Sequence, residues 1–360
     1  SVGQSRLHVN CGTLQLYPVA SYAETTPFLD TVMHVTYENA MTVDVPLGGS
    51  TVIKAAITNV TAVGAASRFV KKGAGTLNFN APLGGLTGDI YVDEGLLTFR
   101  QKFPEGADVR IHVAKGACVS YDISGGGASS LLPLIATDSE GAIGLHGNDK
   151  NENLDLRAYP NLAVRFLTTS TYVGRITPSA NHYIFEASGA AGVYPTAISD
   201  AGGVAARVTV RLIPEVTNNN YVELSGDNSG MTGGVTVEDG AKLWLAHAFA
   251  AGSSGTVKLG EDTTLCLSAA VGAGFLSTRV SADSRPSQIY LLAGAEAVNV
   301  DLSRFPGCHL GTEGNSSVNQ TGTVTPEGNE FHLGGGATPH ASSYTGLRPG
   351  VLQDVDALDV

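Results

Sequence analysis

The sequence has few charged residues, few cysteines and no long apolar run. Only 15% of its 360 residues are Asp, Glu, Lys or Arg, and the formal net charge is −12. Nucleic acid and anionic membranes both require a basic face, so this acidic balance predicts neither as a partner. The longest apolar runs are far shorter than the 18 or so residues of a membrane span, which predicts no membrane insertion.

The patterns that mark metal and nucleophile sites are also missing. The four cysteines (Cys11, Cys118, Cys266 and Cys308) lie far apart and none belongs to a CxxC pair, so no zinc framework is predicted. We interpret them as free, buried thiols, with a disulfide between neighbouring coils as the alternative. The nine histidines form no HExxH, and no Gly-x-Ser-x-Gly is present. We therefore expect no cofactor and no catalysis.

The sequence is rich in glycine and in short stretches where apolar and polar residues alternate. It contains 45 glycines, and the stretch 222–267 alternates apolar and polar residues in short pairs such as Val235 and Val237 or Leu265 and Leu267. A glycine or an acidic turn follows most pairs. Short alternating strands with regular turn punctuation predict an all-β chain of stacked or coiled strands.

This stretch occurs twice. Shifted back by 145 or 146 positions, Val235, Val237 and Gly240 fall on Ile90, Val92 and Gly95, and one inserted residue near Lys242 explains the change of shift. The correspondence continues as far as Gly174–Pro178, which matches Gly322–Pro326 after two more insertions. The sequence thus contains a tandem repeat, and a repeat of this length predicts units that pack on one another.

The repeat divides the chain into three segments. Residues 1–67 are predicted to be a β region that caps the stack or ends a preceding repeat unit. Residues 68–216 form repeat unit 1, and residues 217–360 form repeat unit 2, continuous with unit 1. The chain begins and ends in β-like sequence, so we expect it to be a piece of a longer polypeptide.

Two motifs carry a resemblance to a known family. Gly73–Asn80 is followed by Leu86-Thr87-Gly88 and by Val92–Leu97, and the stretch 222–240 repeats the pattern more fully. These residues resemble the autotransporter-associated β-strand repeat, found in passenger-type regions of large repetitive bacterial surface proteins. The resemblance implies a right-handed parallel β-helix and an extracellular location at the bacterial cell surface.

A string of tandem β-sandwich units is the alternative fold. A sandwich has antiparallel sheets, and its hairpins favour Asn-Gly and Asp-Gly turns. Only Asp239-Gly240 is of this kind. The parallel β-helix is therefore preferred.

The repeat also sorts the candidate site residues, because a working site is seldom duplicated along one stack. Asp93-Glu94 and Glu238-Asp239 both precede a glycine, so we interpret them as turn residues rather than as an acid and base pair. The stretch His146–Asn153 has no polar counterpart, since its sister is the apolar Leu292–Val298. Three carboxylates in and beside it offer oxygen ligands for calcium: Asp149, Glu152 and Asp155. An exposed polar loop is the alternative.

Two functions remain open. The first is a non-catalytic structural or adhesive segment, a stiff β-helical stalk whose surface binds weakly and many times over. Its partners would be glycans, host or neighbouring-cell surfaces, or neighbouring repeats of the same protein. The second is a β-helix enzyme that degrades polysaccharide, as a lyase or glycoside hydrolase, which requires paired carboxylates in a groove.

Overall fold

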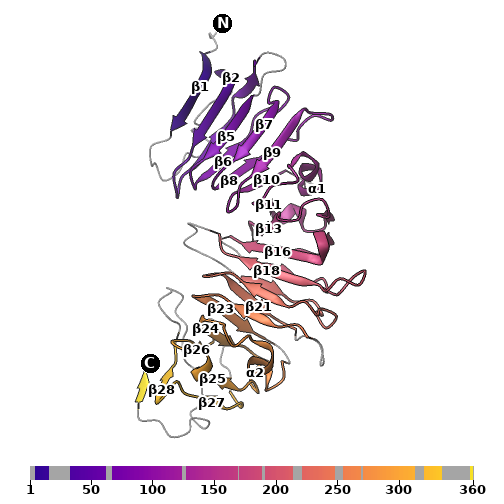
Figure 1. Ribbon diagram of the computed structural model, residues 1–360. Helices are drawn as coiled ribbons and strands as arrows, with labels where there is room; N and C mark the ends of the chain where they lie inside the picture. Colours follow the sequence, from indigo (N-terminus) through magenta and orange to yellow (C-terminus); the bar gives the residue numbers. More distant parts are fainter. Residues whose placement is uncertain are drawn as a thin grey trace. The chain divides into compact units, whose positions relative to one another are not determined.

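The chain folds as a parallel β-helix. The computed structural model describes residues 5–15, 33–61, 67–123, 127–168, 170–188, 191–213, 221–247, 254–268, 271–312, 320–334 and 357–359. It separates into two compact units, one of residues 1–168 and 174–179, the other of residues 169–173 and 180–360. In both units the strands pair in parallel with strands one coil away, and apart from β1 and β2, which have 11 and 12 residues, they are short (Figure 1). The sandwich alternative is therefore wrong, because its strands would pair antiparallel.

Two sheets make up the coils of the first unit. One contains β1 (Ser5–Gln15), β2 (Met33–Asp44), β5 (Arg68–Lys72), β7 (Gly88–Val92) and β9 (Val109–Val113), with β4 (Ala56–Asn59) beside β2. The other contains β3 (Ser50–Ile53), β6 (Thr76–Phe79), β8 (Leu96–Phe99), β10 (Cys118–Tyr121), β11 (Ala142–Leu145) and β13 (Ala163–Phe166). From β5 to β10 the chain alternates between the sheets, so each consecutive pair of strands is one coil.

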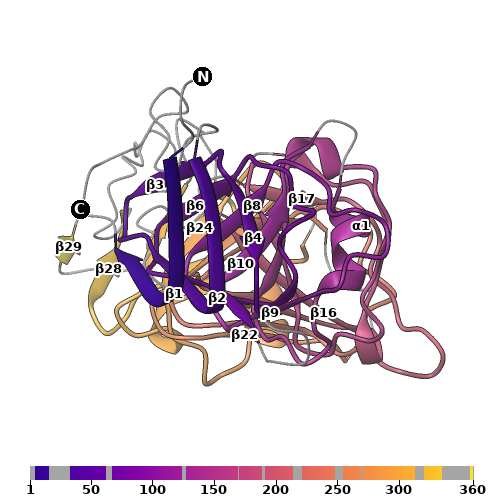
Figure 2. The same cartoon turned by 90° about the horizontal axis from the view of Figure 1, so that it is seen from above.

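After β10 the first sheet gives way to helical turns. The short helix α1 (Ala128–Leu131) and the 3-10 turn η1 (Leu132–Leu134) take the place of a strand, and among the described residues the bridge Ile111–Ile135 alone continues the sheet. Figure 2 shows α1 at the side of the stack. A second 3-10 turn, η2 (Gly147–Asp149), precedes the small ladder between β12 (Leu154–Asp155) and β15 (Ile176–Thr177).

The second unit repeats this plan. One sheet contains β16 (His182–Ala187), β18 (Arg207–Arg211), β20 (Val235–Val237) and β22 (Val257–Leu259). The other contains β14 (Ser170–Thr171), β17 (Gly192–Tyr194), β19 (Tyr221–Leu224), β21 (Lys242–Leu245), β23 (Thr263–Leu267), β24 (Pro286–Leu291) and β26 (His309–Gly311). The remaining elements are α2 (Phe275–Arg279), β25 (Val300–Asp301), β27 (Val324–Thr325), β28 (Glu330–His332), β29 (Ala357–Asp359) and the turns η3 (Ser179–Asn181) and η4 (Leu302–Arg304).

The tandem repeat of the sequence is a repeat of structure. The pairs β7–β9 and β20–β22 have the same register, and both copies then insert a short helix, α1 or α2, before the next strand. The bridge Ile111–Ile135 recurs as Val257–Val280. Gly95 and Gly240 have φ values of 66° and 72°, a conformation that favours glycine and explains why both turns keep it. As domains, segments 1–67, 68–216 and 217–360 remain a prediction.

The interiors of the two copies are filled differently. Phe79, Phe99 and Tyr121 stack in register in copy 1, with ring centroids 6.0 and 6.1 Å apart. Leu224, Leu245 and Leu267 form the corresponding row in copy 2 and are 0–1% exposed. Burying one such side chain stabilises a fold by about 1.5–3 kcal/mol. Row burial along the coils is therefore the main source of stability in both copies.

Candidate functional site

The unduplicated loop after β11 closes one end of α1. Asp149 is fully buried, and its Oδ1 accepts hydrogen bonds from the backbone N–H groups of Gly127 (2.8 Å) and Ala128 (3.1 Å). Its Oδ2 accepts from the N–H of His146 at 2.7 Å. Burial raises the pKa of Asp149, while these three donors act in the opposite direction. The alternative of an exposed polar loop is therefore wrong for Asp149.

Glu152 belongs to the same closure. Its Oε2 accepts from the backbone N–H of Ser129 at 2.6 Å, and Asn148 donates to the carbonyl of Ile123 at 3.3 Å. The first N–H groups of a helix have no partner within the helix. The two carboxylates supply those partners, so the loop holds α1 against the coil.

Asp155 is engaged elsewhere. The Arg157 Nε donates to both of its carboxylate oxygens, at 2.8 and 3.1 Å. The hydrogen bonds from the Arg157 side chain and backbone lower the pKa of Asp155 to about 2. In the part of the chain that the structure describes, no three His, Cys, Asp or Glu side chains converge as a metal site would require. Calcium binding by Asp149, Glu152 and Asp155 remains a prediction, and the protein itself already uses all three carboxylates.

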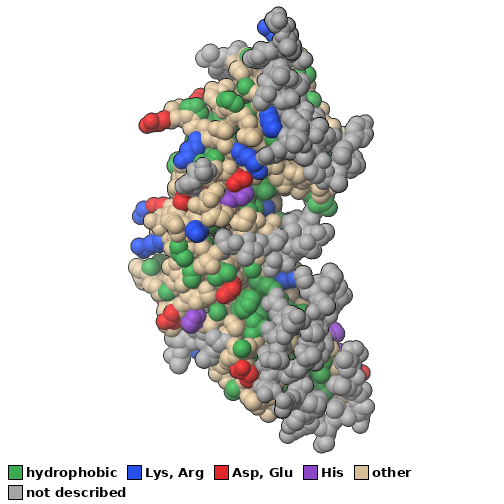
Figure 3. All heavy atoms as spheres, turned by 180° about the vertical axis from the view of Figure 1, so that it is seen from behind, with side chains coloured by type: hydrophobic (Ala, Val, Ile, Leu, Met, Phe, Trp, Pro, Cys, Tyr) green, Lys and Arg blue, Asp and Glu red, His purple; other side chains and the backbone are tan. Residues whose placement is uncertain are grey.

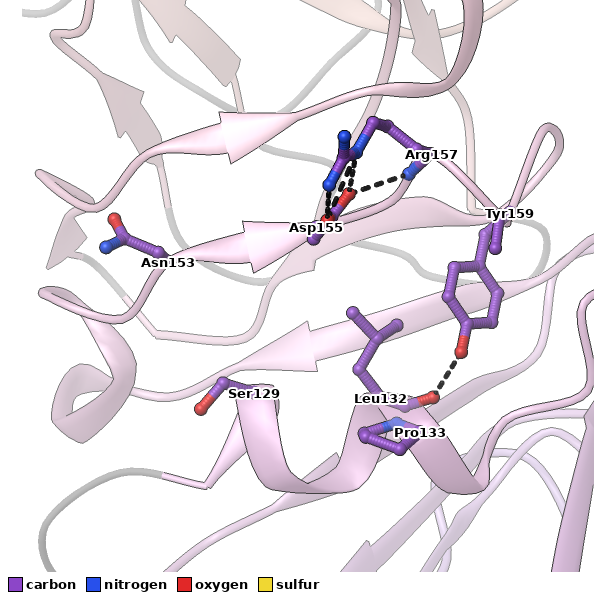
Figure 4. Close-up of a pocket in the computed structure, with 8 residues that line it drawn as sticks. Ser129, Leu132, Pro133, Asn153, Asp155, Arg157 and Tyr159 are labelled. Carbon is purple, nitrogen blue, oxygen red and sulfur yellow. Dashed lines mark hydrogen bonds and ion pairs between the residues drawn. The ribbon is translucent and has the colours of Figure 1, made fainter.

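An open hollow of about 700 Å³ lies beside this loop (Figure 4). Its lining comes from α1, η1 and the segment around β12: Ser129, Leu132, Pro133, Asn153, Asp155, Arg157, Ala158 and Tyr159. The Tyr159 hydroxyl donates to the carbonyl of Leu132 at 2.8 Å, which fixes the ring at one wall. The paired Asp155 and Arg157 belong to the same segment as Tyr159 (Figure 4). Sequence reasoning singled out Asp155 but missed the hollow, because its lining comes from two segments about one coil apart.

Several polar residues make the same bond in both copies. The Oγ of Ser139 accepts from the N–H of Val113 at 3.1 Å, and the Oγ of Ser284 accepts from the N–H of Leu259 at 3.0 Å.

Two asparagine side chains at equivalent positions of the two copies also accept a hydrogen bond from a backbone N–H. Asn153 accepts from the N–H of Arg175 at 2.8 Å, and Asn299 accepts from the N–H of Thr323 at 2.9 Å. These bonds join one coil to the next. Their duplication marks them as parts of the framework.

The paired carboxylates before the turn glycines are turn residues, as the sequence predicted. Asp93 lies 3.9 Å from the Lys72 Nζ, and Glu238 lies 3.8 Å from the Arg211 Nε. Each ion pair joins one coil to the next at the same place in its copy. Neither carboxylate is left as a free acid or base.

A buried lysine was not predicted. Lys71 on β5 points into the coil and is 0% exposed, and its Nζ donates to the carbonyls of Lys72 (2.8 Å) and Glu94 (3.1 Å) as well as Gly73. Burial lowers its pKa from 10.5 to about 8, opposed by Asp44 and Glu94. On β5, Lys71 lies two residues after the buried Phe69, so the alternation of a β-strand turns both side chains toward the interior. This alternation was the one feature of the sequence that could have predicted the burial of Lys71.

The four cysteines are free, as expected, but the prediction that they are buried is wrong for Cys11. Cys118, Cys266 and Cys308 are buried, whereas Cys11 is exposed. No helix of the described residues is long and apolar enough to cross a membrane. The loop after β11 and the hollow beside it are therefore the features from which a function can be argued.

Comparison of the chain with protein-family models, with curated proteins and with solved structures found no match. The resemblance to the autotransporter-associated β-strand repeat therefore remains a prediction. The assignment of the fold as a parallel β-helix follows from the strand pairing and does not depend on a match to a known protein.

Proposed function

We propose that this chain is a non-catalytic structural or adhesive segment of an extracellular bacterial repeat protein. One observation carries the proposal. The polar residues that recur in both copies, such as Ser139 and Ser284 or Asn153 and Asn299, form coil-to-coil hydrogen bonds. A sequence that duplicates its framework and leaves its outer side chains free to differ suits a stalk that presents a surface.

The state of the carboxylates supports a role without catalysis. Hydrolysis of a glycosidic bond uses two carboxyl groups, one of them protonated when the reaction begins. The hollow of Figure 4 contains one carboxylate, Asp155, which Arg157 holds ionised with a pKa of about 2. Asp149 and Glu152 are bound to backbone N–H groups of α1. None of the three is placed as a general acid.

The surface supports weak and repeated binding. On the face shown in Figure 3, charged side chains lie scattered among polar side chains and backbone. The first unit contains 13 basic and 15 acidic residues, a net charge of −2, whereas the second contains 8 and 18, a net charge of −10. The net negative charge, which disfavours anionic partners, therefore lies mainly in the second unit. The first unit is nearly neutral.

A panel experiment tests the proposal. The purified chain is incubated with neutral and acidic polysaccharides, and both retention on the polymer and release of reducing ends or unsaturated products are measured. We expect retention on at least one polymer without product. Product release that scales with protein concentration would establish the enzyme alternative instead.

A further inference from the structure

The outer face of β5, β7 and β9 carries a stack of two rings. Tyr91 on β7 and His112 on β9 are paired in register and point outward. Their ring centroids lie 4.6 Å apart and their planes differ by 9°. Adjacent strands lie about 4.8 Å apart, so the stack places one ring on each strand.

The next position of this stack holds no ring. Val70 on β5 is in register with Tyr91, and Thr42 on β2 is in register with Val70. A valine side chain is much shorter than a tyrosine, so the face of Tyr91 that looks toward β5 lies above a gap. A hollow of about 290 Å³ occupies this place. It is lined by Cys11, Gly12, Thr13, Ala40, Thr42, Arg68, Val70, Lys72, Tyr91 and Asp93.

Polar groups surround the gap. Arg68 and Lys72 lie two residues to either side of Val70 on the same face of β5, about 7 Å away along the strand. Lys72 is paired with Asp93 at 3.9 Å. Arg68 is exposed and forms no ion pair with a described residue. The hollow therefore offers hydroxyl groups from Thr13 and Thr42, the Lys72–Asp93 ion pair, and the guanidinium of Arg68, whose neighbour in register on β7 is Asp89.

Copy 2 keeps the surrounding charges but lacks the rings. The strand that pairs with β20 as β5 pairs with β7 is β18, at the end of repeat unit 1; it presents Arg207 and Arg211 on either side of Thr209, and Arg211 pairs with Glu238 at 3.8 Å. The residues in register on β20 and β22 are Thr236 and Lys258, where copy 1 has Tyr91 and His112. The ion pair between coils thus recurs, as Lys72–Asp93 and as Arg211–Glu238. The ring stack is particular to copy 1 and needs another explanation.

We propose that this hollow binds one acidic sugar unit, a hexuronate, of a polysaccharide. The apolar face of the sugar ring packs against Tyr91 in the position above Val70. The carboxylate pairs with the Arg68 guanidinium, whose planar donors match a carboxylate in two places. The sugar hydroxyls bond to Thr42 and to the Lys72–Asp93 pair. An aromatic ring could stack as well, but it would use none of these polar groups.

This inference rests on the proposed adhesive function and names the class of ligand. A hollow of 290 Å³ suits a single ring, so affinity for one unit is low. Binding to a polymer gains from the many units that can enter the site in turn. The neutral balance of the first unit permits such a partner, which the net charge of the whole chain would disfavour.

The experiment titrates the purified full chain with a uronate trisaccharide and, in parallel, with the neutral hexose trisaccharide of the same linkage. Binding is followed by saturation-transfer NMR and calorimetry. We expect a dissociation constant for the uronate of about 1 mM or tighter, and binding to the neutral sugar weaker by about tenfold. Absence of uronate binding up to about 10 mM would overturn the proposal.

Copy 2 supplies matched variants. Tyr91→Thr introduces the residue that the sister position already accommodates, and it should weaken uronate binding by about tenfold because the stacking face is lost. Tyr91→Phe should retain binding. Arg68→Gln should remove the preference for uronate over neutral sugar, whereas Arg207→Gln, the equivalent change on β18, should leave it unchanged. Equal effects of the two arginine changes would contradict the assignment.

The outcomes separate the two proposals. Unsaturated or reducing products formed from the uronate would overturn the non-catalytic function, whatever the variants do. Retention on neutral polysaccharides without uronate binding would overturn this inference alone. Thermal unfolding of each variant confirms that lost binding is not lost folding.

Discussion

The two copies of the repeat solve the same packing problem with different residues. Copy 1 fills one interior row with Phe79, Phe99 and Tyr121, and copy 2 fills it with leucines at the same register positions. Backbone pairing and the glycine turns fix the coil in both. Core volume can therefore vary so long as each row is buried, which agrees with the tolerance of protein cores for volume-compensated changes.

The loops after the short helices differ more deeply. In copy 1 the buried Asp149 binds the first N–H groups of α1. Its counterpart in copy 2 is Ala295, which is 0% exposed, and at the start of α2 the N–H of Phe275 donates to the carbonyl of Gly272. A buried polar connection in one copy thus corresponds to apolar packing in the other. This contrast teaches that a polar residue without a counterpart can still be structural.

The largest effect should follow from removing that connection. Asp149→Ala leaves three backbone N–H groups without their acceptor, two of them at the buried start of α1, and should lower the free energy of unfolding by about 3–5 kcal/mol. Urea unfolding followed by far-UV circular dichroism measures it. Asp155→Ala, at an exposed pair, is the control and should change the free energy of unfolding little. If the two variants are equally stable, Asp149 does not hold α1.

Lys71 gives the next largest difference, since the equivalent residue on β18 is Val210. Between the folded pKa of about 8 and the unfolded value of 10.5, the unfolded chain keeps a proton that the folded chain releases. Stability therefore rises with pH across this window, and Lys71 contributes up to about 3 kcal/mol to that rise.

Lys71→Met should remove this contribution. Unfolding of the wild type and the variant is compared from pH 7 to 11, because the difference cancels the titration of all other groups. Val210→Met on β18 is the control and should leave the pH slope unchanged. Parallel curves for the wild type and Lys71→Met would show that burial does not perturb this lysine.

A smaller and equal pair of effects is expected from the shared framework. Ser139→Ala and Ser284→Ala each remove the acceptor of one backbone N–H between coils, at a cost of about 1–2 kcal/mol. Both are measured by denaturant unfolding. Costs that differ by more than about 1 kcal/mol would break the equivalence of the two copies.

Calcium should produce the smallest effect. Because Asp149, Glu152 and Asp155 are already bonded to N–H groups and to Arg157, we expect EDTA and excess calcium to leave the melting temperature unchanged. The measurement is differential scanning fluorimetry in both conditions. A calcium-dependent rise that Glu152→Gln abolishes would restore the sequence prediction.

The fold was predictable because its signals are local. Alternation such as Val235-x-Val237, closed by Gly240, indicates a short strand and a turn without any knowledge of its neighbours. Comparing the chain with itself gave the repeat. The helical replacement at α1 was not predicted, since a four-residue helix carries almost no periodic signal.

The candidate site was less predictable because its contacts span coils. Tyr91 and His112 stack although a turn, a strand and a second turn separate them in sequence. The sequence identified the loop with Asp149 as the segment without a counterpart in the other copy. The alternative of an exposed polar loop was wrong for Asp149, which is buried. Burial decides the role of a carboxylate, and a polar loop sequence does not reveal which of its side chains turns inward.

The most direct test of the account compares the two copies by hydrogen exchange with mass spectrometry. If both copies build the same coils, the amides of β7–β11 and of β20–β24 should be protected to a similar degree. Peptides that contain Gly127 and Ala128 should exchange more slowly than those that contain Gly274 and Phe275, because the buried Asp149 accepts from the amides of Gly127 and Ala128, whereas the amide of Phe275 donates to the carbonyl of Gly272. Strong protection in one copy with free exchange in the equivalent strands of the other would contradict the account.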